Sequence, residues 1–116
     1  MAALDNVDIS GKSGTKYSFQ VYPFDQAFNR VGAVYAILRR ERDPKNETMW
    51  RYSPVYVGET SSLLSGFYDH PKEPCFEKED ANCVAVHLDN SEESRKAKEQ
   101  DILDEGVWPC NGKALG

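Results

Sequence analysis

The chain has 116 residues, of which 40% are hydrophobic and 28% are charged, and its formal net charge at pH 7 is −5. This length suits one compact domain, and the chain contains no run of about 18 apolar residues that would span a membrane. An acidic chain binds nucleic acid only through a local basic patch, because affinity for phosphates grows with the number of cations that neutralise them.

The N-terminal part of the chain divides into a polar stretch and a strand. Residues 1–14 are polar and contain glycines, so we expect a flexible arm followed by a single domain over residues 15–116. The segment TKYSFQVYPF then alternates apolar and polar side chains. This period of two predicts a half-buried strand that ends at Pro23.

Two further strands follow, at residues 33–40 (AVYAILRR) and 54–58 (PVYVG). The first is the more apolar, so we expect it in the middle of the sheet. Residues 41–53 are polar and include a proline and an asparagine, which predicts a long hairpin loop. The four arginines around this hairpin (Arg39, Arg40, Arg42 and Arg51) are either a local basic patch or a solvated hairpin end.

A helix is expected after the third strand. Thr60 or Ser61 would cap it, Leu63 and Phe67 would belong to its apolar stripe, and the prolines of HPKEP would end it. Gly66 lies inside this helix, where glycine costs about 1 kcal/mol relative to alanine.

The last third of the chain predicts one strand and one helix. Residues 81–89 (ANCVAVHLD) predict a fourth strand. Asn90 and Glu93 form a capping box for a final helix that ends before Gly106. The element order predicts an α+β fold with a small, mostly antiparallel sheet, an extra N-terminal strand and two or more flanking helices.

The three cysteines, Cys75, Cys83 and Cys110, form no CxxC pair. An odd number of cysteines favours buried thiols in a reducing compartment, so we expect a cytoplasmic protein. An alternative is a zinc site made of His70, Cys75, Cys83 and His87, although their spacing matches no closed finger motif.

The last helix carries the first candidate functional residue. Glu99 lies three and four residues before Ile102 and Leu103 and therefore shares their inward face. A carboxylate on that face is costly unless it is paired or binds a metal. The alternative is a partly exposed glutamate at the edge of the apolar stripe, paired with Arg95.

Two tyrosines provide a second candidate feature. Tyr35 and Tyr56 lie on strands joined by the hairpin, so their side chains could face each other. Phenols beside a carboxylate could orient or deprotonate a water molecule. Tyrosines in strands more often serve packing alone, and this alternative also fits.

Taken in order, these segments resemble the GIY-YIG nuclease superfamily. Ala33-Val34-Tyr35 is similar to the GIY motif, with a conservative change at its first residue, and Tyr56-Val57-Gly58 is similar to the YIG motif. His70, Glu99 within ExxIL and Asn111 within PCN follow in the family's order. The resemblance covers about residues 15–112, and the strand before the GIY motif resembles an extra strand of bacterial stand-alone members.

The resemblance implies metal-dependent hydrolysis of DNA phosphodiester bonds. Glu99 would bind Mg²⁺ or another divalent cation, because magnesium is held by few carboxylates and completes its shell with water and substrate phosphate. Tyr35 or Tyr56 would position or deprotonate the attacking water, with His70 as a relay. Gly58, Asn111 and the arginines Arg39 and Arg40 would contribute to substrate binding.

One position departs from the family pattern. The family's catalytic arginine falls eight residues after the YIG glycine, where this chain has Gly66. Either another cation, such as Arg39 or Arg40, stabilises the phosphate, or the site is weak or inactive. Two alternatives follow: a non-catalytic domain that binds nucleic acid or a protein partner, and an accidental resemblance in a small α/β domain of another function.

Overall fold

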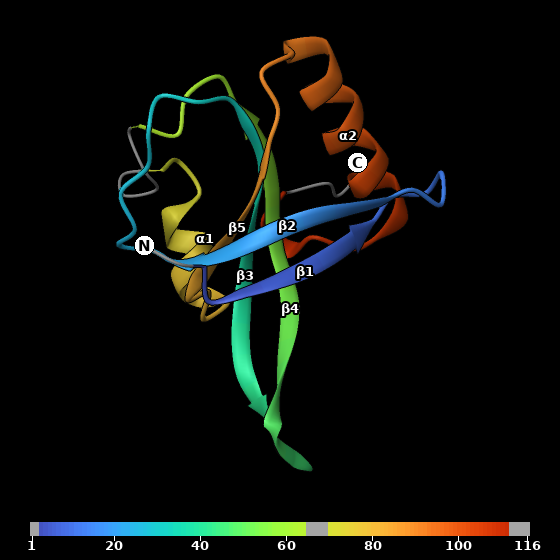
Figure 1. Cartoon of the computed structure of the whole chain (residues 1–116). Coiled ribbons are helices and arrows are strands. Elements are labelled where there is room, and N and C mark those ends of the chain that lie inside the picture. Colours follow the sequence, from blue (N-terminus) through green and yellow to red (C-terminus); the bar gives the residue numbers. More distant parts are fainter. Residues whose placement is uncertain (1–2, 65–69, 112–116) are drawn as a thin grey trace.

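The chain folds around one antiparallel sheet that carries a helix on each side of its long hairpin (Figure 1). In this computed structural model, residues 3–64 and 70–111 are described. The strands are β1 (Asp5–Ser10), β2 (Lys16–Pro23), β3 (Ala33–Asp43), β4 (Asn46–Thr60) and β5 (Cys83–Leu88). The helices are α1 (Glu73–Lys78) and α2 (Glu92–Glu105), and the 3₁₀ turn η1 (Pro109–Asn111) follows.

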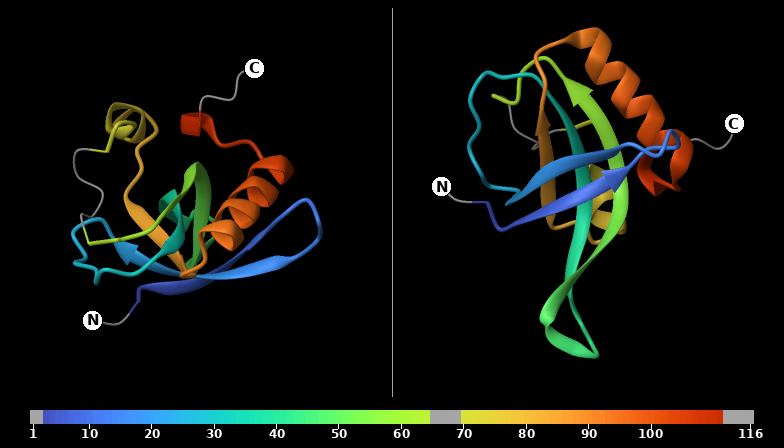
Figure 2. Two further views of the ribbon diagram at one scale, coloured as in Figure 1. Left: turned by 90° about the horizontal axis from the view of Figure 1, so that it is seen from above. Right: turned by 45° about the vertical axis from the view of Figure 1, so that its right-hand side comes forward.

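The strand order is β1-β2-β5-β3-β4, and every neighbouring pair is antiparallel. This confirms the predicted α+β class, and β3 has a partner on both sides as expected. The sheet curls, so β1 and β2 run across the β3–β4 hairpin, whose tip extends beyond the rest of the molecule (Figures 1 and 2).

Side-chain alternation along the strands gives the sheet two apolar faces. Val34 and Ala36 of β3 belong to the face on which α2 packs through Ile102. Tyr35 and Ile37 belong to the other face, which α1 covers through Phe76. The two helices lie on different sides of the β3–β4 hairpin, as seen along the sheet in Figure 2. Alternate residues of β3 therefore face α2 and α1 in turn.

The expected N-terminal arm is wrong for residues 5–10, which form strand β1. Six consecutive residues of β1 pair with β2, and the half-buried Val7 and Ile9 pack against the core. Only two apolar side chains mark this strand in the sequence. Pairing with β2 supplies the stabilisation that the local sequence does not indicate.

The expected long loop over residues 41–53 is also wrong, because β3 and β4 extend almost to the hairpin tip. The guanidinium carbons of Arg40 and Arg42 lie 3.8 Å and 4.5 Å from the Trp50 ring centroid. Across the strands, Arg51 lies 3.5 Å from the Glu41 carboxylate. Cation–π and charge pairs of this kind hold strands together without an apolar alternation.

The helix expected after Thr60 is not found in the described residues up to Leu64. The Thr60 hydroxyl instead closes a local turn by accepting from the Ser62 N–H at 3.2 Å. Gly66 and Phe67 lie outside the described residues. The helix that does form, α1, begins where the sequence indicated a stop, because Pro74 lies in its first turn, where proline needs no hydrogen-bond partner.

The final helix is close to its prediction. It ends at Glu105 before Gly106, but its N-cap is Ser91 rather than Asn90, and the Ser91 hydroxyl accepts from the Ser94 N–H. Ile102 is buried and Leu103 packs against the core from this helix, as the sequence predicts.

The expectation of three free thiols is wrong. Cys75 at α1 and Cys110 in η1 form a disulfide with a Cα–Cα distance of 5.7 Å, and Cys83 is the remaining buried thiol. Burial raises the pKa of the Cys83 thiol to about 12. No described helix is long and apolar enough to cross a membrane.

Candidate active site

Three aromatic side chains from distant segments meet on the α1 face of the sheet. The Tyr35 and Tyr56 ring centroids lie 6.1 Å apart on the neighbouring strands β3 and β4. The His70 ring lies 5.1 Å from the Tyr56 ring, and its Nε2 atom is 2.8 Å from the Tyr35 hydroxyl. The Phe76 ring of α1 packs against the His70 ring, with 5.0 Å between the two ring centroids.

Gly58 makes this arrangement sterically possible. In the sheet register Gly58 lies opposite Tyr35. A Cβ atom at Gly58 would stand 2.7 Å from the Tyr35 ring and hydroxyl and 3.0 Å from the Tyr56 ring. The first distance is shorter than real Cβ contacts and the second is unusually tight, so any other residue at position 58 would force the Tyr35 ring to move. The predicted role of Gly58 in substrate binding stays a prediction; the geometry gives it a steric role.

The hydrogen bonds define the direction of the His70–Tyr35 contact. The Lys72 N–H donates to His70 Nδ1 at 3.0 Å, so this nitrogen is an acceptor. Burial, assisted by the Lys72 charge, lowers the pKa of His70 and keeps the imidazole neutral at pH 7. A neutral imidazole with Nδ1 as acceptor carries its proton on Nε2. His70 therefore donates to the Tyr35 oxygen.

A second hydrogen bond joins the two phenols. It raises the pKa of Tyr35, which burial raises even more strongly, and it lowers the pKa of Tyr56. Overall, burial and the charge of Glu99 still raise the pKa of Tyr56. Tyr56 is the more exposed phenol of the two.

Glu99 of α2 lies within electrostatic range of both phenols. Its negative charge raises the pKa of Tyr35 and is the largest cause after burial for the raised pKa of Tyr56. The pKa of Glu99 itself is raised, first by burial and then by the neighbouring carboxylate of Glu59. The charge of Glu99 therefore acts on both phenols, although α2 packs on the sheet face opposite to the one that carries Tyr35.

The sequence did not indicate the ion pair beside Glu99. The buried Arg95 side chain is 5% exposed, and its Nε atom lies 2.8 Å from Glu59 Oε1. Its Nη1 atom donates to the Asp89 carbonyl at 3.1 Å. Arg95 was considered as a partner for Glu99, but it binds Glu59 instead. Two features of the sequence could have pointed to this ion pair. Arg95 shares a helix face with Glu99, and Glu59 directly follows the YVG segment.

Glu99 and Glu59 fit a hard divalent cation. Burial and the neighbouring Glu59 charge raise the pKa of Glu99, and a bound cation would relieve both effects. Magnesium requires only one or two carboxylates when water and a phosphate complete its shell. Among the described residues, no group of three or more histidine, cysteine or acidic side chains is placed to hold a metal. The fit is therefore to a substrate-completed site rather than to an all-protein cage.

The zinc alternative is wrong. Cys75 is bound in the disulfide, and the Cys83 thiol contacts the Leu38 carbonyl. His70 lies on the α1 face, whereas His87 lies against the Phe19 ring on the α2 face. The sheet separates the two histidines.

Asn111 is engaged by the protein itself. Its Oδ1 accepts from the Val57 N–H at 3.0 Å, and its Nδ2 donates to the Val57 carbonyl at 2.9 Å. Because β4 is an edge strand, this amide takes the place of a neighbouring strand at the residue between Tyr56 and Gly58. The geometry gives Asn111 a positioning role, and substrate binding by it stays a prediction.

The two arginines proposed for substrate binding lie on opposite faces of the sheet. Arg40 follows Ala36 and Leu38 on the α2 face, where its Nε donates to the Tyr52 hydroxyl at 2.9 Å. Arg39 shares the face of Tyr35 but lies four residues farther along β3, about 13 Å at the usual strand rise. Only Arg39 is therefore on the correct face.

No family model matches the sequence, and no curated protein or solved structure is significantly similar to the chain.

Proposed function

We propose that this chain is a GIY-YIG-type nuclease domain that hydrolyses DNA phosphodiester bonds slowly and with a divalent cation. The observation that carries the proposal is the hydrogen-bonded contact of His70 with Tyr35, placed beside Tyr56 over a glycine at which any Cβ atom would displace the Tyr35 ring. A purely structural aromatic cluster would need neither the charge of Glu99 acting on it nor the steric opening at Gly58.

In the proposed reaction, Tyr56 is the general base. It is the more exposed phenol, and its hydrogen bond with Tyr35 works against the burial and the Glu99 charge that raise its pKa. Tyr35 and His70 are positioning residues that hold the Tyr56 ring through their hydrogen bond and ring contacts. Glu99 would hold the cation, which when bound supplies Lewis-acid activation of the phosphate. With its charge neutralised, Glu99 no longer raises the pKa of Tyr56.

We expect the activity to be weak because no side chain within residues 3–64 and 70–111 is placed to replace the family's arginine. Position 66 is glycine. Arg95 is held by Glu59 and Asp89, and Arg39 lies about 13 Å along β3 from Tyr35. Loss of one preorganised donor of this kind typically lowers the rate by about 10²–10³.

A second candidate function is a non-catalytic domain that binds nucleic acid or a protein partner. The observation that favours it is the pair of carboxylates, Glu59 and Glu99, near the phenols. Arg95 neutralises Glu59, but Glu99 without a cation repels a phosphate and Gly66 adds no compensating charge, so the acids support loss of catalysis and favour a protein partner over nucleic acid.

The test is cleavage of supercoiled and single-stranded DNA with Mg²⁺ or Mn²⁺. We expect slow nicking by the wild type, a loss of at least about 100-fold in Glu99→Gln, and an unchanged rate in Glu93→Gln. Glu93 is an exposed acid on the same helix, so this variant controls for net charge. Gly66→Arg should accelerate cleavage by about 10²–10³.

The outcomes separate the candidates. Cleavage that survives Glu99→Gln would contradict the proposed site. Absence of cleavage in both the wild type and Gly66→Arg, with DNA binding at low salt, would favour the non-catalytic domain. Absence of both cleavage and binding would contradict both roles in nucleic-acid chemistry.

The cytoplasmic location expected from the sequence stays a prediction. It was inferred from an odd number of thiols, and the Cys75–Cys110 disulfide argues against it, because such bonds persist mainly in oxidising compartments. Fractionation of cells that make the protein would test it.

A further inference from the structure

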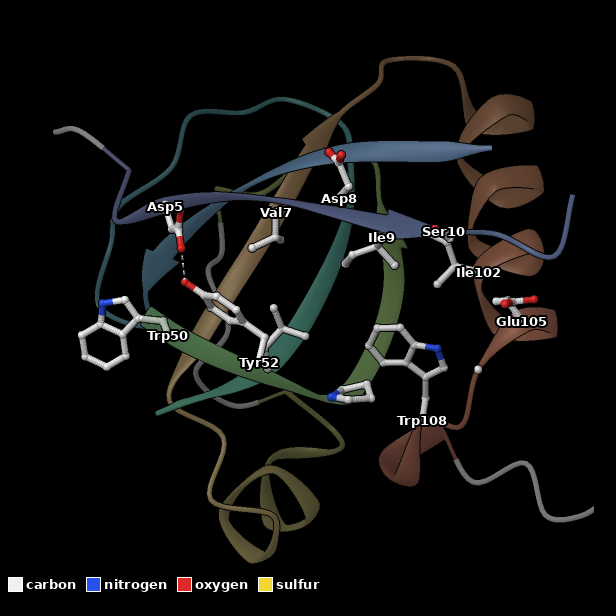
Figure 3. Close-up of a pocket in the computed structure, with 13 residues that line it drawn as sticks. Asp5, Val7, Asp8, Ile9, Ser10, Trp50, Tyr52, Ile102, Glu105 and Trp108 are labelled. Atoms are coloured by element: carbon white, nitrogen blue, oxygen red, sulfur yellow. Dashed lines mark hydrogen bonds between the residues drawn. The ribbon is translucent and has the colours of Figure 1, made fainter. Parts of the chain in front are cut away.

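A groove lies on the side of the sheet away from Tyr35 and His70. It has a volume of about 610 Å³ and is lined by β1, β4 and the C-terminal end of α2 (Figure 3). Val7 and Ile9 of β1 and Trp108 supply apolar walls. This volume is within the range of binding sites for small molecules and peptide side chains.

The groove runs along an open sheet edge. β1 is the terminal strand and pairs only with β2 within the described chain. Consecutive β1 residues, Asp8 and Ile9, point to opposite faces, yet both line the groove. The outer edge of β1, with its outward N–H and C=O groups, therefore borders the groove and is available to an added strand.

The opposite sheet edge is protected. Pro54 lacks a backbone donor, and Asn111 covers the Val57 backbone with its amide. The two edges are joined at one end of the groove, where the Tyr52 hydroxyl of β4 donates to Asp5 of β1 at 2.8 Å. An added strand would therefore pair with β1 and not with β4.

The charged side chains that line the groove are all acidic. Its lining residues include three acids and no basic side chain. Asp5 is engaged by Tyr52, whereas Asp8 and Glu105 form no ion pair within the described residues. Glu105 also ends α2, whose last turn holds no basic residue. The negative end of the helix dipole adds to this potential, so a cation is favoured here.

Trp108 stands at the end of the groove next to α2. Its side chain is 8% exposed and packs with the core on the α2 face of the sheet. Its indole N–H is not one of the buried polar groups left without a partner in the described chain. It points toward Glu105 at the rim of the groove (Figure 3), where a peptide carbonyl can accept a hydrogen bond from it.

We propose that this groove binds an extended peptide segment of a partner protein, in which basic and apolar side chains alternate. The segment pairs with the outer edge of β1. Its apolar side chains lie over Val7 and Ile9, and a basic side chain lies beside Asp8, because opposed residues of paired strands share a face. Glu105 at the end of α2 adds to the negative potential that attracts the basic side chains. This inference is independent of the proposed nuclease activity, since it uses none of the same side chains.

The probes are labelled peptides six residues long, the length of β1. One alternates arginine and valine, one alternates glutamate and valine, and one has the arginine–valine composition in two blocks. Both tryptophans of the chain line the groove, so intrinsic fluorescence reports occupancy, and anisotropy of the label gives the affinity. We expect binding tighter than about 100 µM for the alternating basic peptide, and at least about tenfold weaker binding for the other two.

Charge-reversal variants locate the peptide. Asp8→Lys and Glu105→Lys should each weaken binding by at least about tenfold. Asp104→Lys changes the same net charge at the same helix end, but Asp104 does not line the groove, so affinity should change less than about twofold.

Three results would overturn the proposal: absence of binding at low salt, equal affinity for the acidic peptide, or equal losses in all three lysine variants. Concentration-dependent sedimentation that Asp8→Lys abolishes would also contradict it, because the groove would then hold a second copy of the chain.

Discussion

At the scale of single residues, the candidate site depends on one imidazole held in a defined tautomer. The Lys72 N–H fixes Nδ1 as an acceptor, and Nε2 reaches the Tyr35 hydroxyl. Protonating this ring would place a second proton on Nδ1 and break the bond from Lys72. Burial also opposes the charged ring, and the lowered pKa of His70 therefore agrees with a neutral imidazole in the folded protein.

This pKa gives stability a defined pH dependence. Near the unfolded value of about 6.5 the unfolded chain binds more protons at this site than the folded chain, so stability rises with pH. The contribution of His70 is complete above about pH 6.5 and is lost as pH falls through the lower folded pKa. In urea unfolding between about pH 5 and 7, His70→Gln should have a shallower pH slope than the wild type. Equal slopes would show that His70 ionises freely in the folded protein.

At the scale of elements, the η1 turn holds the edge of the sheet beside the site. It is tied to α1 by the Cys75–Cys110 disulfide and to β4 by Asn111. Val57, which Asn111 binds, is fully buried. Losing the amide would leave two backbone groups without partners between Tyr56 and Gly58.

We therefore expect Asn111→Ala to lower the free energy of unfolding by about 1–3 kcal/mol. It should also reduce any cleavage activity, because the strand that carries Tyr56 loses its outer support. Asn82 makes the same pair of bonds to the Arg40 backbone, far from the phenols. Asn82→Ala is the matched control and should leave activity unchanged. Equal losses of activity in both variants would argue against a positioning role for Asn111.

At the scale of the whole molecule, local patterns predicted the strands well. The alternation of Tyr17, Phe19 and Val21 placed β2, and the apolar run from Ala33 placed β3 inside the sheet. Their period-two patterns carry enough information because each strand is buried on at least one face.

What the sequence did not predict was determined by contacts between distant residues. The hairpin extends because Arg40 and Trp50 stack, and β1 forms because β2 is available to pair. Cys75 and Cys110 are 35 residues apart, and neither has a neighbour that indicates a bond. In the candidate site, Tyr35 and Tyr56 could be paired from the hairpin alone, but the ion pair of Arg95 depends on how α2 packs.

The central claim is that Glu99 and the two phenols form one cation-dependent site. It is tested most directly by titrating Mn²⁺ into the isotopically labelled protein and recording paramagnetic broadening of the backbone amide signals. We expect broadening of Glu99 in α2 and of Tyr56 and Gly58 in β4, and its loss in Glu99→Gln but not in Glu93→Gln. Broadening confined to the acidic end of α2 around Glu105, or unchanged by Glu99→Gln, would contradict the claim.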